Sequence, residues 1–199
     1  MKTSAFAQRL GIMGFVLVLA FALTCALTGT ASAVELGAKF TKGGNTYKVT
    51  EAYENAHDLG EVTLVKYGSS STTPTVNTVK YKGETFEVEA IGKNAFNNAK
   101  GHIITSIKLG KHVDKIGAKA FYGCSKLKSI DMRKCEAIDL EKEHGKWEID
   151  DLNIGSKAFA KAGVSSVKVK CGSSNASYQK LFKKALVSKG LRSNAKIVK

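Results

Sequence analysis

The chain has 199 residues, of which 43% are hydrophobic and 24% are charged, and its formal net charge is +14. This is the composition of an ordinary globular protein, so wholesale disorder and collagen-like or mucin-like fibres are excluded. The length allows one or two domains.

Residues 1–33 have the organisation of a secretory signal peptide. Lys2 and Arg9 make a positive start without an acidic residue, an apolar stretch follows, and Ala31-Ser32-Ala33 supplies the small residues that precede a cleavage site. Cleavage before Val34 leaves 166 residues and lowers the net charge to +12, because Lys2 and Arg9 are removed. A chain of this length can bury a core without disulfide staples.

The apolar stretch from Leu10 to Leu27 leaves one alternative, an uncleaved membrane anchor, because its length reaches the lower limit for spanning a bilayer. The small residues before Val34 favour cleavage instead. A lipid-modified cysteine is not indicated, because Ala22-Leu23-Thr24 before Cys25 does not fit a lipoprotein signal. The sequence therefore predicts a secreted or cell-surface protein with no membrane segment after cleavage.

Residues 34–88 contain short β-like runs separated by turn residues. The runs cover residues 39–50, 61–67 and 76–88, and a loop rich in serine and threonine occupies residues 68–74. We predict a β-meander of antiparallel strands that acts as an N-terminal cap on the repeats described next. A small independent β domain is the alternative.

Three copies of the pattern I-G-x-x-A-F organise the middle of the chain. They begin at Ile91, Ile116 and Ile154, with spacings of 25 and 38 residues. The glycine of each copy indicates a turn or a close backbone approach that a side chain would block. The phenylalanine can fill the interior between neighbouring copies. Because one such unit cannot bury its own core, stacked units are expected to share one.

Each copy continues into a run in which polar and apolar residues alternate, the pattern of a half-buried strand. The runs are Ser106-Ile107-Lys108-Leu109, Ser129-Ile130-Asp131-Met132 and Ser166-Val167-Lys168-Val169. Between the phenylalanine and the run, the copies also align Ala99 with Cys124 and Ala162, and Leu127 with Val164. Cys124 is therefore expected to be a small buried apolar residue.

The pattern I-G-x-x-A-F-x-x-C-x-x-L-x-S-I-x-M at residues 116–132 resembles the BspA-like leucine-rich repeats of bacterial secreted and surface proteins. The resemblance implies an α+β repeat fold, a short and curved solenoid with a parallel strand ladder. It also implies adhesion or partner binding rather than catalysis. We assign residues 89–172 to this solenoid, and a charged insertion at residues 133–151 lengthens the third spacing.

Residues 173–199 are predicted to form a helix-containing C-terminal cap. A helix over residues 177–189 places its apolar side chains on one face and lysines opposite, and Gly190 follows as a stop. Residues 195–198 are expected to add a last strand. The apolar face consists of Tyr178, Leu181, Phe182, Ala185 and Leu186.

Catalytic and metal-binding patterns are missing from the sequence. It has no nucleotide-binding glycine loop, no H-E-x-x-H and no G-x-S-x-G. Cys124, Cys135 and His144 are too widely spaced for structural zinc. We therefore predict no catalytic residue, no metal and no cofactor. The cysteines are expected to be free thiols, with a Cys124–Cys135 bridge as the alternative. The four histidines, His57, His102, His112 and His144, are expected to be solvated.

The outward side chains of the alternating runs are the predicted binding face, because alternation places them opposite the buried residues. They are Ser106, Lys108, Ser129, Asp131, Ser166 and Lys168. The alternative binding element is the insertion, which includes Trp147. The excess of lysine over arginine argues against specific nucleic-acid recognition. The net charge of +12 after cleavage favours anionic surroundings such as cell-wall polymers, and the alternative is that the scattered lysines only keep a secreted protein soluble.

The sequence predicts a secreted or cell-surface, non-enzymatic repeat protein that binds another macromolecule, by protein–protein interaction or adhesion. One alternative is a structural protein held in the envelope by its positive charge on anionic cell-wall polymers. A second is an enzyme with its site in the insertion or in the N-terminal cap.

Overall fold

The computed structural model describes residues 34–199 except residues 55–58, 139–141, 144–145 and 148–151, and for residues 142–143 and 146–147 it describes the backbone alone. The predicted signal peptide and cleavage site at residues 1–33 lie outside the described residues, as do His57 and His144. The described residues form one compact unit.

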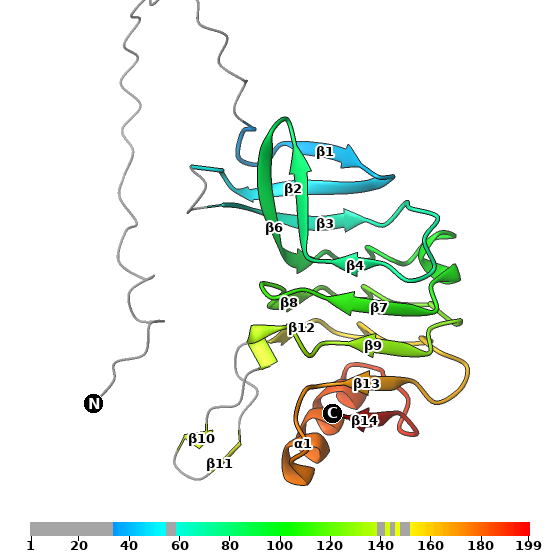
Figure 1. Ribbon diagram of the computed structural model, residues 1–199. Coiled ribbons are helices and arrows are strands. Elements are labelled where there is room, and N and C mark those ends of the chain that lie inside the picture. The colour runs from blue at the N-terminus through cyan, green and yellow to red at the C-terminus, as the bar shows by residue number, and fades with distance from the viewer. Residues whose placement is uncertain (1–33, 55–58, 139–141, 144–145, 148–151) are drawn as a thin grey trace, which may run out of the picture. The chain divides into compact units, whose positions relative to one another are not determined.

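Two sheets hold most of the strands (Figure 1). The first, which we call the mixed sheet, has the order β1 (Lys39–Lys42), β2 (Asn45–Glu51), β3 (Gly60–Lys66), β6 (Glu84–Ile91), β8 (Lys115–Ile116) and β12 (Asn153–Ile154), with β5 (Thr78–Tyr81) paired to β6. The second, which we call the parallel ladder, has the order β4 (Thr75–Val76), β7 (Ser106–Leu109), β9 (Ser129–Asp131), β13 (Lys168–Lys170) and β14 (Lys196–Val198). The other elements are the hairpin β10 (Lys142–Glu143) and β11 (Lys146–Trp147), the short helical turns η2 (Gly101–Ile103) and η3 (Glu136–Ile138), and the helix α1 (Ala176–Ser188).

The alternating runs form the parallel ladder, as the sequence predicts. All four strand pairs of this sheet are parallel, and Ile107, Ile130 and Val169 face one another in register and are buried. The third copy is displaced from the expected alignment. Its strand begins at Lys168, two residues later than the alternation indicates, because the turn around Gly163 has a different length. Val164, which the pattern aligns with buried Leu127, is 71% exposed.

The three phenylalanines of the repeat pattern stack as predicted. The ring centroids are 4.9 Å apart between Phe96 and Phe121 and 5.4 Å apart between Phe121 and Phe159, and all three side chains are fully buried. Tyr67 adds a fourth ring, 4.6 Å from Phe96, that the sequence pattern does not identify. We call Tyr67, Phe96, Phe121 and Phe159 the aromatic column. It runs through the core from one copy to the next.

The isoleucine–glycine step of each copy also forms a parallel strand, which the sequence analysis did not predict. Ile91, Ile116 and Ile154 are in register in the mixed sheet, and the amide of Gly117 donates to the Ile91 carbonyl at 2.7 Å. A Cβ at Gly117 would lie 2.5 Å from the Lys93 nitrogen. The glycine is therefore required by a close approach of two backbones, one of the two roles expected for it.

The N-terminal strands follow the predicted meander only in part. The pairs β1–β2 and β2–β3 are antiparallel, but β3 pairs with β6 in parallel. The reason is that β3 occupies the position that the strand of an additional, preceding copy would have. The Gly92 amide donates to the Leu64 carbonyl of β3 at 2.8 Å, just as the Gly117 amide donates to the Ile91 carbonyl of β6. The prediction of an antiparallel arrangement is wrong for this pair. Thr75 and Val76, which follow the loop rich in serine and threonine, form β4 and pair with β7 in the parallel ladder.

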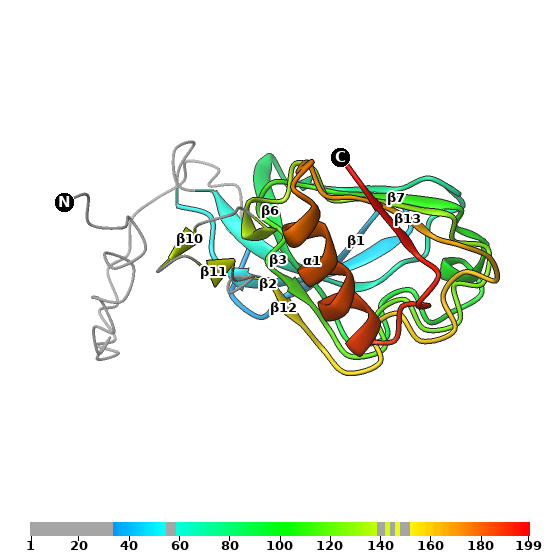
Figure 2. The ribbon, with the colours of Figure 1, turned by 90° about the horizontal axis from the view of Figure 1, so that it is seen from below.

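The C-terminal helix and strand are confirmed. The helix α1 buries Tyr178, Phe182 and Leu186, and the Asn175 side chain caps its first turn by accepting from the Tyr178 amide at 3.1 Å. Leu181 and Ala185, on the same predicted face, are half-buried. The chain then turns at Gly190, whose φ is +99°, and β14 completes the parallel ladder. Figure 2 shows the helix lying across the end of the two sheets.

Candidate functional site

The parallel ladder brings together five of the six outward residues that the sequence predicts. Two rows of aligned residues cross the strands: Ser106, Ser129 and Lys168 form one, and Lys108, Asp131 and Lys170 form the other. Lys108 and Lys168 are exposed, and the two serines are half-buried.

Ser166 is the sixth predicted residue, and it does not belong to this face. It lies before β13, and its hydroxyl donates to the Asn194 carbonyl at 2.8 Å. The displaced register of the third copy is the reason, and it places Lys170 in the row where the alignment put Lys168.

Asp131 is held in place by a residue that the sequence analysis missed. Arg133 donates from Nε to Oδ1 of Asp131 at 2.9 Å and from Nη2 to Oδ2 at 2.7 Å, and its backbone amide donates to Oδ1 at 3.3 Å. These hydrogen bonds from Arg133, followed by its positive charge, keep the pKa of Asp131 below its ordinary value. A signal was present, because residues two apart on a strand share a face.

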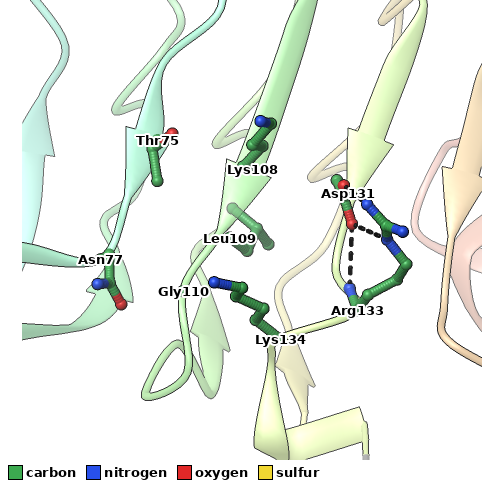
Figure 3. A pocket seen from close by; sticks show the side chains of 8 residues that line it. All are labelled: Thr75, Asn77, Lys108, Leu109, Gly110, Asp131, Arg133 and Lys134. Carbon is green, nitrogen blue, oxygen red and sulfur yellow. Dashed lines mark hydrogen bonds and ion pairs between the residues drawn. The ribbon is translucent and has the colours of Figure 1, made fainter.

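A hollow of about 520 Å³ lies at the carboxyl ends of β4, β7 and β9. Figure 3 shows the Asp131–Arg133 pair on one side of it and Lys134 extending across the ladder toward Gly110 and Asn77. A Cβ at Gly110 would collide with Asn77, so a glycine is needed for the two strands to lie this close. The lining consists of Thr75, Asn77, Lys108, Leu109, Gly110, Asp131, Arg133 and Lys134.

The charges of the hollow are three cationic side chains and one carboxylate. The carboxylate of Asp131 already takes both hydrogen bonds of the guanidinium, so the ammonium groups of Lys108 and Lys134 remain as the excess charge. No ion pair of either lysine occurs within the described part of the chain. The hollow is therefore suited to an anionic group.

The three cysteines of the described chain are free and buried. Cys124 lies in the core as expected, although Ala99, its counterpart in the first copy, is exposed. Burial raises the pKa of Cys124 and of Cys135 to about 12, which disfavours the reactive thiolate. The Sγ of Cys135 donates to the Val113 carbonyl at 2.7 Å. The preference for free thiols over a Cys124–Cys135 bridge is confirmed.

Two histidines differ from the prediction of solvated groups. His112 is half-buried, with its Nε2 3.0 Å from Oε1 of Glu87. His102 has a buried Nε2 against Gly123 that finds no hydrogen-bond partner among the described residues. In the same part of the chain, no three histidine, cysteine or acidic side chains are grouped so that they could hold a metal ion.

Trp147, the alternative binding residue, ends β11, where its backbone pairs with Lys142. Its side chain lies outside what the structure describes.

No helix in the described ranges has both the length and the apolar character needed to cross a bilayer.

Repeated strands that pair in parallel and present a polar outward face are typical of a repeat protein. Residues 74–142 match the family described as BspA type Leucine rich repeat region, in 6 copies. This part of the chain thus consists of BspA-type leucine-rich repeats, as the resemblance indicates, and the match begins early enough to include β4.

Among solved structures, the chain is similar to a leucine rich cell surface protein from Faecalibacterium prausnitzii A2-165, with 21% sequence identity and a TM-score of 0.43. The similarity covers 67% of this chain and 33% of that protein, so this chain spans about a third of its length. No curated protein matches the sequence.

Proposed function

We propose that the chain is a secreted or cell-surface repeat protein that binds another protein through the outward face of the parallel ladder, without catalysis. The observation that carries this proposal is the basic hollow at the carboxyl ends of β4, β7 and β9 (Figure 3). The leucine-rich repeats of residues 74–142 and the sequence of residues 1–33, which is typical of an export signal, support it.

The repeats act, in this proposal, as a short solenoid with a cover at each end. The ends of a stacked array expose apolar cross-sections that need covering. Strands β1 and β2, which lie beyond β3 in the mixed sheet, are suited to the N-terminal end. The helix α1, with its buried Tyr178, Phe182 and Leu186, is suited to the C-terminal end. Such covers keep the strands rigid, and a rigid surface loses less entropy on binding.

The partner surface that fits the hollow is an acidic segment of a protein. Lys108 and Lys134 supply two positive charges on a wall whose carboxylate is already paired with Arg133. The lining contains no nucleophile beside a base, which supports recognition rather than turnover.

The test compares three proteins that begin at Val34: the unchanged chain, Lys108→Ala with Lys134→Ala, and the control Lys39→Ala with Lys48→Ala. Lys39 and Lys48 are exposed and pair across β1 and β2, so the control removes the same charge far from the ladder. Each protein is used to capture proteins from envelope and host-cell extracts at physiological salt. A partner that binds the unchanged chain and the control but not the Lys108/Lys134 variant supports the proposal. A partner retained by all three, or none at all, contradicts it.

A further inference from the structure

One edge of the molecule consists of five successive turns that contain no acidic residue. The turns span residues 66–74, 92–105, 117–128, 155–167 and 189–195, and together they carry ten lysine or arginine residues and no aspartate or glutamate. We call them the turn edge. Backbone hydrogen bonds join each turn to the next, and they run from Tyr67 to Ala95, from Phe96 to Ala120, from Phe121 to Ala158 and from Phe159 to Lys189.

The positive charge of the chain is concentrated toward this edge and the C-terminus. Residues 34–151 contain 18 basic and 17 acidic residues, whereas residues 152–199 contain 11 basic residues and no acidic one. Lysines that served only for solubility would be interspersed with acidic residues. In Figure 1 the turns that precede β7, β9 and β13 lie at the side opposite the hairpin β10–β11.

Two lysines of the turn edge lie over one aromatic ring, and a third belongs to the adjacent turn. The Nζ atoms of Lys161 and Lys119 lie 5.2 Å and 6.0 Å from the centroid of the Tyr122 ring. Lys157 is the counterpart of Lys119 in the next copy, and the Lys119 amide donates to the Ser156 carbonyl at 3.1 Å. All three lysines are exposed, and the ion pairs of the described residues include none of them.

The phenol of Tyr122 reports the field of this group. A hydrogen bond with Lys161 lowers the pKa of Tyr122, burial opposes this effect, and the charges of Lys161, Lys119 and Lys157 add individually smaller lowering effects. Three positive charges are thus held together without a carboxylate from the neighbouring turns. An anion that settles between them gains from all three.

The backbone at these lysines is unusual for the residue type. Lys119, Lys157 and Lys161 have φ values of +55°, +55° and +60°. The first copy has Asn94, with φ of +59°, at the position of Lys119 and Lys157, whereas Lys161 stands where the preceding copy has Gly123, with φ of +75°. Asparagine adopts this left-handed conformation more readily than lysine. Lysine instead of asparagine at such a backbone position is explained if the lysine side chain has a role other than stabilising the fold.

We propose that the turn edge, with Lys119, Lys157 and Lys161 at its centre, binds a linear polymer that carries a phosphodiester in each unit of a polyol chain. Five turns at the strand spacing of about 4.8 Å extend over roughly 20 Å, which accommodates several phosphates in a row. Ammonium groups bind phosphate as point charges, without the forked geometry that arginine supplies for base edges. Single-stranded nucleic acid would need stacking platforms, and Tyr122 is a single ring.

This surface is distinct from the hollow, because it uses different lysines on a different side of the strands. The two proposals can therefore fail separately. The turn edge requires no export step to be tested, since the protein that begins at Val34 carries all of it.

The experiment measures the binding of fluorescently labelled poly(glycerol phosphate) by anisotropy over a series of salt concentrations. The variant is Lys119→Asn with Lys157→Asn and Lys161→Asn, because Asn94 shows that asparagine fits the backbone of Lys119 and Lys157, and asparagine also tolerates the positive φ of Lys161. The control is Lys39→Asn with Lys48→Asn and Lys80→Asn, which removes three exposed lysines from β1, β2 and β5. We expect the variant to bind at least about tenfold more weakly, with the slope of log K against log salt reduced by about 2, and the control to change little.

Equal losses in the variant and the control would mean that net charge alone attracts the polymer, and would overturn the proposal. Tighter binding of single-stranded DNA than of poly(glycerol phosphate), with the same dependence on the three lysines, would also overturn it. The thermal melt of each variant verifies folding. If the triple variant does not fold, Lys161→Gln alone is compared with Lys80→Gln, and an equal affinity of these two proteins contradicts the proposal.

Discussion

Replacing Phe121 by alanine tests whether the stacked copies share one core. The side chain is fully buried and lies between Phe96 and Phe159, at ring distances of 4.9 Å and 5.4 Å. Truncation of a buried phenylalanine costs about 3–5 kcal/mol, and each lost aromatic pair adds about 0.5–1.5 kcal/mol to the simple burial effect. The flanking backbones cannot close the space, because the Phe121 amide is bonded to the Ala158 carbonyl at 2.8 Å. We therefore expect a loss of about 4–5 kcal/mol.

The assay is urea unfolding at 25 °C, followed by circular dichroism, on the protein that begins at Val34. Phe121→Leu is the matched control, because leucine keeps most of the apolar volume and removes only the ring stacking, at a cost of about 1–2 kcal/mol. A loss below about 1 kcal/mol for Phe121→Ala would refute the shared core, since so small a change is typical of surface sites.

Double-mutant cycles add a second criterion. Leucine substitutions at Phe96 and Phe121, which are adjacent in the column, should couple by about 0.5–1.5 kcal/mol. The same substitutions at Phe96 and Phe159, which Phe121 separates, should be additive within about 0.5 kcal/mol. Equal coupling for both pairs would contradict the order of rings in the column.

Three further predictions concern the backbone contact, pH and the hollow. Gly117→Ala should cost about 1–3 kcal/mol in urea unfolding, because its Cβ would lie 2.5 Å from a backbone nitrogen, and an unchanged midpoint would contradict the close approach. Burial, and then the charges of two neighbouring glutamates, raise the pKa of Glu61 to about 8, so the folded state holds a proton that the unfolded state loses above 4.5. Stability should therefore fall as pH rises between about 4.5 and 8. In thermal melts, Glu61→Gln should reduce this dependence on pH, whereas the control Glu35→Gln, at an exposed site, should leave it unchanged. Arg133→Ala should lower stability at neutral pH and lose this effect only as pH falls below 3.8, because the pKa of Asp131 is lowered from that value in the folded state and the ion pair needs an ionised carboxylate. An effect independent of pH would exclude the ion pair as its cause.

The parts of the fold that could be predicted are those where a repeated residue has a repeated cause. A phenylalanine that recurs after isoleucine, glycine and alanine meets its own counterpart in the next copy, so the aromatic column follows from the pattern. Tyr67 is the exception, because the residues before it lack the glycine and alanine. Its place is revealed only by the bond from the Tyr67 amide to the Ala95 carbonyl.

Register within a copy could not be predicted from alternation alone. Val167 and Val169 are both fully buried, so the pattern of apolar residues is satisfied by either alignment of the third strand. The length of the turn after Phe159 decides between them, and the amide of Gly163, bonded to the Cys124 carbonyl, determines that length. For this reason alternation predicts Ser166, and not Lys170, on the binding face.

The residues of the hollow also fall into those that alternation predicts and those that it does not. Lys108 and Asp131 follow from alternation, whereas Lys134 and Asn77 lie just past the ends of strands, where no period applies. Asn77 comes from a loop whose contribution to the ladder, β4, has only two residues. A site built at strand ends therefore depends on where each strand stops, which is the feature that sequence patterns determine least well.

The two proposed surfaces differ in how closely they are tied to the fold. Lys108 lies in the strand that buries Ile107, and Asp131 lies in the strand that buries Ile130. A change at the hollow can therefore disturb the register that the core requires. Lys119, Lys157 and Lys161 protrude from turns whose backbone is already bonded to the next copy, and asparagine occupies the position of Lys119 and Lys157 in the first copy. Charge on the turn edge can therefore vary at little cost to stability. It follows that the triple asparagine variant should melt within a few degrees of the unchanged protein, whereas Asp131→Asn should melt lower, and the opposite order would show that the turn lysines serve the fold instead of a partner.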